Sequence, residues 1–323
     1  MCALFFLIFQ PYRHCDSVSI EPQLIQNFYT QWMRSGSTFQ RAAILFGRYV
    51  DEPVETNNPG AIRANVFALY EPPQESAKDF VRFLKDPHEK TIHALAARCG
   101  LEVVGWIVTT VERTGDKYGG HVIMSGLEVQ QAARFQNRYK NALGHSRFVT
   151  IVMEHAATVE PRAFQVSDLA VCLERDGVFA KAPDSNMIAT RAPAAGEMVP
   201  TVVYKDRPLL PGKEFLPDEF IVKVILTAPS AGAGGDPVFR HADFPGLSSS
   251  PTDAMLKGYM AKYAREDYVS KLADFNLLAF LLAKAVLPEK AVGEVCDAIR
   301  ERKSIGKDTQ SQLDSAFLAK GLM

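Results

Sequence analysis

The side chains in this chain that could hold a metal or act as nucleophiles are seven histidines and five cysteines. His88 and His93 lie five residues apart, whereas the two histidines of an HExxH zinc site lie four apart on one helical face. The other five histidines are isolated in the sequence, and the cysteines form neither a CxxC motif nor a Cys/His ligand spacing. The sequence therefore predicts no metal ligands, no cofactor and no disulfide framework.

Two further features could suggest chemistry, but each has a simpler structural interpretation. Residues 230–235 (SAGAGG) are rich in glycine like a phosphate-binding loop, yet no Lys-Ser/Thr pair follows them, so we interpret the run as a flexible connector. Cys99 ends a predicted helix, where a free cysteine usually packs as a small apolar side chain. A cysteine nucleophile would also need a histidine and an orienting group, which the local sequence does not supply.

Composition narrows the classes of function. The chain has 323 residues, 47% of them hydrophobic and 23% charged, which is typical of a globular protein with a sizeable core. A net charge of −1 argues against nucleic acid as the main partner.

The scattered, odd-numbered cysteines favour a reducing compartment, the cytosol or nucleus. The apolar run at residues 3–9 lacks the basic flank and cleavage site of a signal peptide, and no stretch reaches the roughly 18 to 20 apolar residues that span a bilayer.

The elements that would position functional side chains alternate in type along the first half. Apolar residues at spacings of three and four predict helices, and β-branched runs bounded by turn residues predict strands. Ser125 and Glu128 match a capping box, in which each side chain bonds a free amide at the start of a helix. The predicted helices span residues 21–34, 87–99 and 125–139, and the predicted strands span 41–50, 61–71 and 101–111.

The second half is predicted to contain strands first and helices afterwards. The expected strands cover residues 147–155, 164–174, 199–204 and 220–227, with a surface loop at 180–196. The expected helices cover 251–264, 269–286 and 289–302, followed by a weaker one at the end of the chain. The sequence therefore predicts an α+β fold.

Residues 104–110 (VGWIVTT) resemble the strand end of MPN domains, where a zinc isopeptidase carries Gly-Trp-Tyr-His-Ser-His-Pro. Val108 and Thr110 occupy the positions of the two zinc-binding histidines, and neither side chain can replace an imidazole. The later Ser-x-x-Asp element is Ser-x-x-Glu here, at Ser125 and Glu128. The resemblance therefore implies an MPN-like domain without metal ligands and without enzymatic activity.

A second set of short motifs is similar to the nuclear protein localization 4 family and occurs in that family's order. The similarity covers residues 12 to about 302, on both sides of the expected end of the MPN-like domain. The motifs are YRHCD at 12–16, LFGRY at 45–49, IRA at 62–64, YEPPQ at 70–74, GL at 100–101, VGWI at 104–107, FQN at 135–137, FQVS at 164–167, VP at 199–200, YKDRPL at 204–209 and DF at 274–275.

This resemblance implies a ubiquitin-binding adaptor that presents polyubiquitinated proteins to the valosin-containing AAA+ ATPase, together with the ubiquitin fusion degradation 1 protein. Proteasomal degradation, including endoplasmic-reticulum-associated degradation, would follow. The resemblance places this work in the cytoplasm and nucleus, or at the surface of the endoplasmic reticulum. In such proteins, the groove between the MPN-like and C-terminal parts holds an unfolded ubiquitin segment. The groove candidates in this chain are Tyr70, Glu71, Pro72, Pro73, Gln74, Phe135, Gln136, Asn137 and Gln165. Their alternative role is to pack the sheet against its helices.

The expected organisation has three parts. Residues 1–11 are an unassigned apolar leader, 12–157 form the MPN-like domain, and 158–323 form a C-terminal domain with strands to about 227 and helices from about 251. Family members usually begin with a ubiquitin-like domain and a zinc-finger region, and we expect neither here. Two alternatives stay open: a metal-dependent deubiquitinase of the MPN class, and a structural MPN scaffold subunit of a larger complex.

Overall fold

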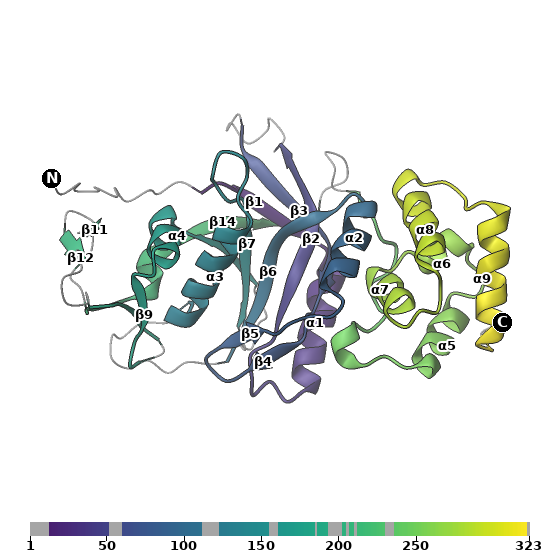
Figure 1. The fold of residues 1–323 in the computed structure, drawn as a ribbon, viewed down its shortest axis with the longest axis horizontal. Helices are drawn as coiled ribbons and strands as arrows, with labels where there is room; N and C mark the ends of the chain where they lie inside the picture. Colours follow the sequence, from purple (N-terminus) through teal and green to yellow (C-terminus); the bar gives the residue numbers. More distant parts are fainter. Residues whose placement is uncertain are drawn as a thin grey trace.

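The computed structural model describes residues 13–51, 60–111, 123–154, 161–192 except 185, 202–204, 207–209, 212–229 and 236–321. A closed barrel of seven strands lies at its centre, and helices cover the outside (Figure 1). The barrel strands are β1 (Ser17–Ile20), β2 (Ala42–Asp51), β3 (Ile62–Tyr70), β6 (Glu102–Thr110), β7 (Val149–Glu154), β8 (Arg162–Val166) and β14 (Ile221–Thr227). The fold is therefore α+β, as predicted.

The order around the barrel is β1-β14-β8-β7-β6-β2-β3, and β3 pairs with β1 to close it. Three pairs are parallel, namely β1 with β14, β1 with β3, and β6 with β7, and the other four are antiparallel. The expected domain boundary after residue 157 falls between β7 and β8, which pair directly. Residues from both sides of that boundary therefore build one sheet.

Apolar side chains line both faces of this sheet, which explains why the residues of β6 after Glu102 are all buried. One hydrophobic cluster joins one face of the strands to Leu24 and Phe28 of α1 (Pro22–Arg34). A second and larger cluster joins the other face to the remaining helices. The helices of the first part are α2 (Glu89–Arg98), α3 (Gly126–Arg138) and α4 (Asp168–Arg175).

The predicted helix ends agree closely with the structure. Pro22 occupies the first turn of α1, where its missing N–H is not needed. The Ser125 hydroxyl accepts a hydrogen bond from the Glu128 amide, and the Glu128 carboxylate accepts one from the Ser125 amide, which confirms the capping box. Gly100 follows α2 with a φ of 72°, a value that favours glycine.

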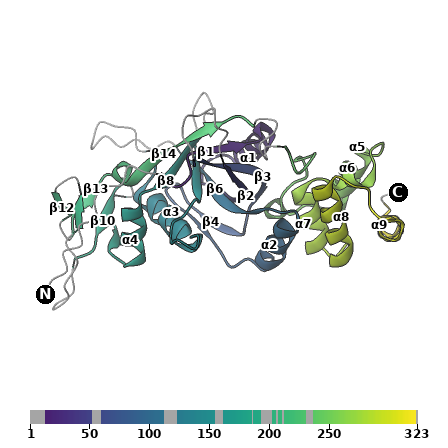
Figure 2. The same ribbon diagram turned by 90° about the horizontal axis from the view of Figure 1, so that it is seen from above.

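Five helices form a group at one end of the molecule, beside α2 (Figures 1 and 2). They are α5 (Asp253–Lys262), α6 (Tyr268–Leu272), α7 (Phe275–Ala283), α8 (Glu289–Glu301) and α9 (Lys307–Ala319). Arg98 of α2 pairs with Asp297 of α8 at 2.8 Å, and Arg300 donates a hydrogen bond of 3.0 Å to the Arg98 carbonyl. A hydrogen bond with the Cys99 thiol, together with burial, raises the pKa of Cys296 in the same contact. The helical group is therefore anchored on α2.

Three small sheets lie outside the barrel. One is a hairpin of β4 (Gln74–Ser76) and β5 (Val81–Phe83). Another joins β9 (Phe179–Lys181), β10 (Ile188–Thr190) and β13 (Glu214–Phe215), and the third joins β11 (Val202–Tyr204) and β12 (Arg207–Leu209). Two short 3-10 helices, Pro217–Phe220 and Leu247–Ser249, complete the described elements.

Three predictions of secondary structure were wrong. Residues 164–174 are not one strand, because the Ser167 hydroxyl accepts from the Ala170 amide and starts α4. Residues 269–286 are not one helix, because Asp274 caps α7 and separates it from α6. The predicted surface loop at 180–196 contains most of β9 and all of β10, and Ile188 is fully buried.

The predictions for the apolar run at 3–9 and for the connector at 230–235 concern residues outside the described part of the chain. None of the helices that the structure describes combines the length and the apolar character needed to cross a membrane.

Candidate functional site

The carboxyl end of β6 carries the two positions where the MPN comparison would place zinc-binding histidines. Val108 is fully buried in the core, and the Thr110 hydroxyl points to the Met153 carbonyl at 3.5 Å. Glu128 is engaged by the Ser125 amide at 2.7 Å and also by the side-chain amide of Gln40. These residues do not fit a zinc ion, because they supply no imidazole and their one carboxylate already caps a helix.

A pocket of about 280 Å³ lies between the β4–β5 hairpin, α2, α3 and the neighbouring barrel strands. It brings together three of the predicted groove residues, Tyr70, Pro72 and Phe135, although Phe135 is 65 positions away from Tyr70 in the chain. Other apolar side chains in its wall are Ile44, Phe46, Phe83, Leu84 and Tyr139. The other seven lining residues are polar or charged, so the pocket combines an apolar surface with polar groups that could orient a ligand.

Tyr70 and Phe135 form the floor of this pocket. The Tyr70 hydroxyl donates a 2.8 Å hydrogen bond to Asp86, and burial together with this carboxylate raises the pKa of Tyr70 well above its usual value. The Phe135 ring is 6% exposed and lies 5.2 Å from the Trp106 ring, 5.4 Å from Phe148 and 5.7 Å from Phe83, measured between centroids. Both side chains therefore also hold the core together.

The rim of the pocket is charged and more exposed. Arg138 pairs with Glu89 at 2.7 Å, which raises the pKa of the arginine, and Arg134 pairs with Glu174 of α4 at 2.5 Å. Burial lowers the pKa of His93, so this side chain favours its neutral form. Leu84 is 46% exposed at the mouth of the pocket. Leu84 is the apolar wall residue most open to a ligand.

Three predicted groove residues are glutamines that bind the protein's own backbone. Gln74 accepts from the Ala42 amide at 2.9 Å and donates to the Ala42 carbonyl at 3.0 Å. Gln136 makes the same pair of bonds with Val166, at 2.7 and 2.9 Å.

Gln165, the third glutamine, makes four such bonds. It accepts from the amides of His14 and Cys15 and donates to the carbonyls of Ser146 and Phe148, all at 2.8 to 3.1 Å. The side chains of Gln136 and Gln165 are buried. These amides join segments of the fold and are not presented to a ligand.

The other predicted residues divide between interior and surface. Glu71 is buried and pairs with Arg41 at 2.5 Å, while its burial raises the pKa of the carboxyl. Pro73 is exposed, and Asn137 is half-buried.

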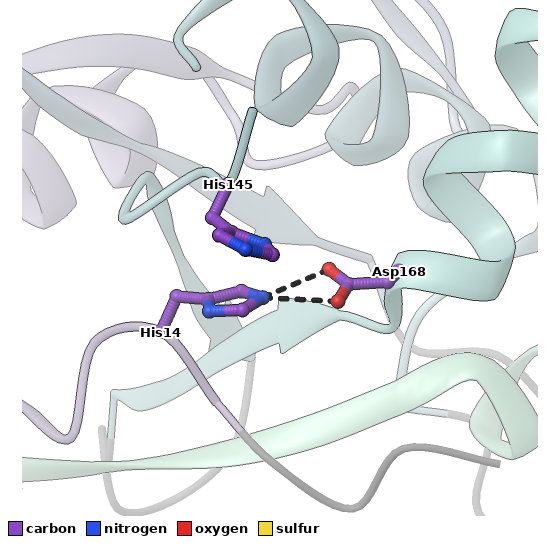
Figure 3. Close-up of side chains that lie close together, drawn as sticks. All are labelled: His14, His145 and Asp168. Atoms are coloured by element: carbon purple, nitrogen blue, oxygen red, sulfur yellow. Dashed lines mark hydrogen bonds and ion pairs between the residues drawn. The ribbon is translucent and has the colours of Figure 1, made fainter. Parts of the chain in front are cut away.

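The structure also brings together two histidines that are isolated in the sequence, His14 and His145, and an aspartate that the sequence analysis did not single out, Asp168. His14 Nε2 lies 3.0 Å from each carboxylate oxygen of Asp168, and the His145 ring stacks on the His14 ring with centroids 4.5 Å apart (Figure 3). His14 precedes β1, His145 precedes β7, and Asp168 is the first residue of α4. Only the closed sheet makes them neighbours, so no local sequence spacing signals this cluster.

The barrel and its helices place this chain among the α+β proteins built on a closed mixed sheet. A sequence model of the NPL4 family matches residues 41–317. The chain therefore belongs to the NPL4 family.

Individual relatives agree with this assignment. The nuclear protein localization protein 4 homologs of Mus musculus and Homo sapiens are each 29% identical to this chain over 333 residues, which cover 91% of this chain and 52% of the relative. The homolog of Drosophila melanogaster is 27% identical over 326 residues, which cover 91% of this chain and 49% of the relative. The chain spans about half the length of these curated relatives.

Proposed function

We propose that this chain is a non-enzymatic, ubiquitin-binding adaptor that helps present polyubiquitinated proteins to the valosin-containing AAA+ ATPase. Extraction and proteasomal degradation, including endoplasmic-reticulum-associated degradation, would follow, with the ubiquitin fusion degradation 1 protein as a second partner. The observation that carries this proposal is membership of the NPL4 family over residues 41–317. The cytoplasm and nucleus, and the cytoplasmic surface of the endoplasmic reticulum, are the places where this work would be done.

The end of β6 supports the non-enzymatic part of the proposal. In an MPN-like interpretation of the barrel, Val108 and Thr110 stand where a zinc isopeptidase needs histidines, and Glu128 is held by a capping box. A metal-activated water needs three protein ligands and an open fourth position. Without these ligands the domain would position ubiquitin chains and would not cleave them.

The pocket between the β4–β5 hairpin, α2 and α3 is the proposed place where a ubiquitin segment binds. Its floor is aromatic and aliphatic and its rim is charged, so it offers apolar contacts to the side chains that an unfolded segment exposes. Among the described strands, β5 pairs with β4 alone, so its other edge can accept a strand. Strand addition beside an apolar pocket is a common mode of peptide recognition.

Of the predicted groove residues, Tyr70, Pro72 and Phe135 line this pocket, whereas Gln74, Gln136 and Gln165 bind the protein's own backbone. We therefore place the ligand contacts on Phe83 and Leu84, with the buried side chains of Tyr70, Pro72 and Phe135 as the floor. Truncation of Phe135 is a poor test, because removing a buried aromatic ring costs about 3 to 5 kcal/mol of stability.

Leu84→Ala is the sharper test, because Leu84 is 46% exposed and lines the pocket. We expect the purified variant to bind polyubiquitin chains at least about fivefold more weakly than the unmodified chain, because a contact of about 1 kcal/mol or more is lost. Leu318→Ala is the matched control, since Leu318 is 67% exposed on α9, in the helical group beyond α2. Binding is measured by fluorescence anisotropy with labelled chains, and both variants are checked by thermal unfolding.

Equal binding by Leu84→Ala and Leu318→Ala, at unchanged melting temperatures, would exclude the pocket. Retention of ubiquitin chains by the unmodified protein separates the adaptor from a structural scaffold, which has no reason to hold them. Cleavage of the chains that a chelator abolishes would instead support a metal-dependent deubiquitinase.

A further inference from the structure

The geometry points to a second site at the other end of the barrel. Val108 and Thr110 lie at the carboxyl end of β6, whereas this site lies at the amino end of the neighbouring parallel strand β7. We propose that His14, His145 and Asp168 bind one divalent transition-metal ion of the zinc class. The three side chains each offer one ligand atom, and these atoms all lie within 4.8 Å of one another. Among the described residues, no other group of three potential ligands is as close.

The types of ligand select the class of ion. Two imidazole nitrogens and one carboxylate oxygen form a donor set suited to Zn²⁺, Co²⁺ or Ni²⁺, whereas Mg²⁺ and Ca²⁺ prefer oxygen atoms alone. Three protein ligands leave one tetrahedral position for water or for a group from a partner. The proposed site is therefore open at one position.

The present distances are close to those that coordination needs. With bonds of about 2.0 to 2.1 Å, tetrahedral ligand atoms lie about 3.3 Å apart. His14 Nε2 already lies 3.0 Å from both Asp168 oxygens, and Figure 3 shows the His145 ring above this pair. The ligand atoms now lie within 4.8 Å of one another, so a change in the His145 side-chain torsions that brings its ring nitrogen to about 3.3 Å from the other two closes the set. The exposure of His145 leaves room for this change.

The backbone that carries the three residues is held in place by the fold. Gln165 accepts from the His14 amide at 2.8 Å and donates to the carbonyl of Ser146, the residue after His145, at 3.1 Å. One buried side chain thus fixes the two histidine-bearing segments relative to each other. Asp168 is fixed by α4, whose first turn is capped by Ser167. Preorganised ligands lose little conformational freedom when a metal binds.

The turn before β7 is equally well defined. The Asn141 side chain accepts hydrogen bonds from the amides of Leu143 and His145 at 2.9 and 3.1 Å, and the Asn141 amide donates to the His145 carbonyl at 2.8 Å. The backbone of His145 is therefore restrained while its ring stays exposed.

This site is separate from the end of β6. In the register of β6 and β7, Gly105 is opposite Val149 and Thr110 is opposite Glu154. His145 lies before Val149, so the proposed metal lies beyond the amino end of β7, and Val108 and Thr110 lie near its carboxyl end. Metal bound at His145 would tie three chain segments together and would not rebuild an isopeptidase centre. The proposal therefore does not depend on the proposed function.

The test is a titration of the untagged, chelator-treated chain with Co²⁺, which reports tetrahedral coordination by its visible absorption, followed by competition with Zn²⁺. We expect one Co²⁺ per chain, displaced by one Zn²⁺, with affinity that falls in acid because protons compete for the imidazoles. His145→Ala removes one imidazole ligand, and Asp168→Asn replaces the anionic carboxylate with a neutral amide, so each should weaken binding at least about tenfold.

His88→Ala is the matched control, because His88 is partly buried at the start of α2 and belongs to no ligand group within the described residues. Its affinity should equal that of the unmodified chain. His145 is exposed on its turn, so its replacement leaves the core intact, and circular dichroism of each variant checks this. Absence of stoichiometric binding would overturn the proposal. An affinity for Co²⁺ that stays within twofold in either ligand variant would overturn it as well.

Discussion

Asp274 is a fully buried carboxyl group at the start of α7. It accepts hydrogen bonds from the amides of Phe244, Asn276 and Leu277 at 3.0, 2.9 and 3.1 Å. These bonds favour the charged form, but burial outweighs them and raises the pKa of Asp274 to about 7. One residue thus caps α7, separates it from α6, and links stability to pH.

The direction of that linkage follows from the proton count. Between the unfolded pKa of about 3.9 and the folded value, the folded state binds one more proton than the unfolded state, so the free energy of unfolding decreases as pH rises. Between pH 5 and pH 8, Asp274 should lower the free energy of unfolding by roughly 2 to 3 kcal/mol. Urea unfolding measures the free energy of unfolding of the unmodified chain and of Asp274→Asn at pH 5 and at pH 8. The prediction is that the difference between the two proteins changes by this amount from one pH to the other. A difference that stays constant, or grows in favour of the unmodified chain at pH 8, would contradict the prediction.

The described residues that line the pocket all lie between Ile44 and Tyr139, whereas the predicted groove lies between the MPN-like and C-terminal parts. The motifs also did not show the role of each residue. Tyr70, Pro72 and Phe135 meet in one pocket, whereas Gln74 and Gln136 hydrogen-bond to the backbone amide and carbonyl of Ala42 and of Val166. A glutamine side chain has one donor group and one acceptor group whether it binds its own chain or a ligand, so the sequence cannot distinguish the two.

The His14, His145 and Asp168 cluster could not be predicted for a different reason. His14 and His145 are 131 positions apart, and the closed sheet alone brings them together. Metal sites that depend on such contacts have no characteristic spacing in the sequence.

The predicted helix starts were reliable where an N-terminal signal agreed with the apolar period, namely Pro22 in α1 and the Ser125 capping box in α3. The strand predicted at 164–174 failed because a short apolar run is compatible with a strand or a helix. Ser167 followed by Asp168 was the available signal for a helix start. In the same way, Asp274 was the signal that divides α6 from α7.

Two helical glycines give a matched prediction for packing between elements. Gly126 begins α3, and a Cβ atom there would lie 2.0 Å from the Met187 carbonyl oxygen and 3.0 Å from the Ile188 Cα. Because these are backbone atoms next to and within β10, Gly126→Ala should destabilise the protein by about 1 to 3 kcal/mol. Gly258 in the exposed face of α5 has no described atom within 4 Å of the same position, so Gly258→Ala should stabilise it by about 0.5 to 1 kcal/mol.

Thermal or urea unfolding of the two variants measures the predicted loss and the predicted gain of stability. Each variant carries the same substitution, glycine to alanine, so the two results can be compared directly. Equal stability of Gly126→Ala and Gly258→Ala would show that α3 and β10 do not approach as closely as described.

Strands from both sides of residue 157 close one barrel. The helical group from Asp253 onward is anchored on α2. The alternation of helices and strands predicted the α+β class. It could not predict barrel closure, because the pairing of β1 with β14 joins residues more than 200 positions apart. The pocket lies where the barrel, α2, α3 and the β4–β5 hairpin meet, so its position depends on this long-range closure.

We propose that a ubiquitin segment occupies this pocket. A photoreactive phenylalanine derivative placed at position 84, in the mouth of the pocket, tests it directly when the purified chain is irradiated with polyubiquitin. The same derivative at position 318, on the exposed face of α9, is the control. We expect a covalent adduct that contains ubiquitin from position 84 and little or none from position 318. Absence of an adduct at position 84, or equal yields at the two positions, would show that ubiquitin does not occupy this pocket.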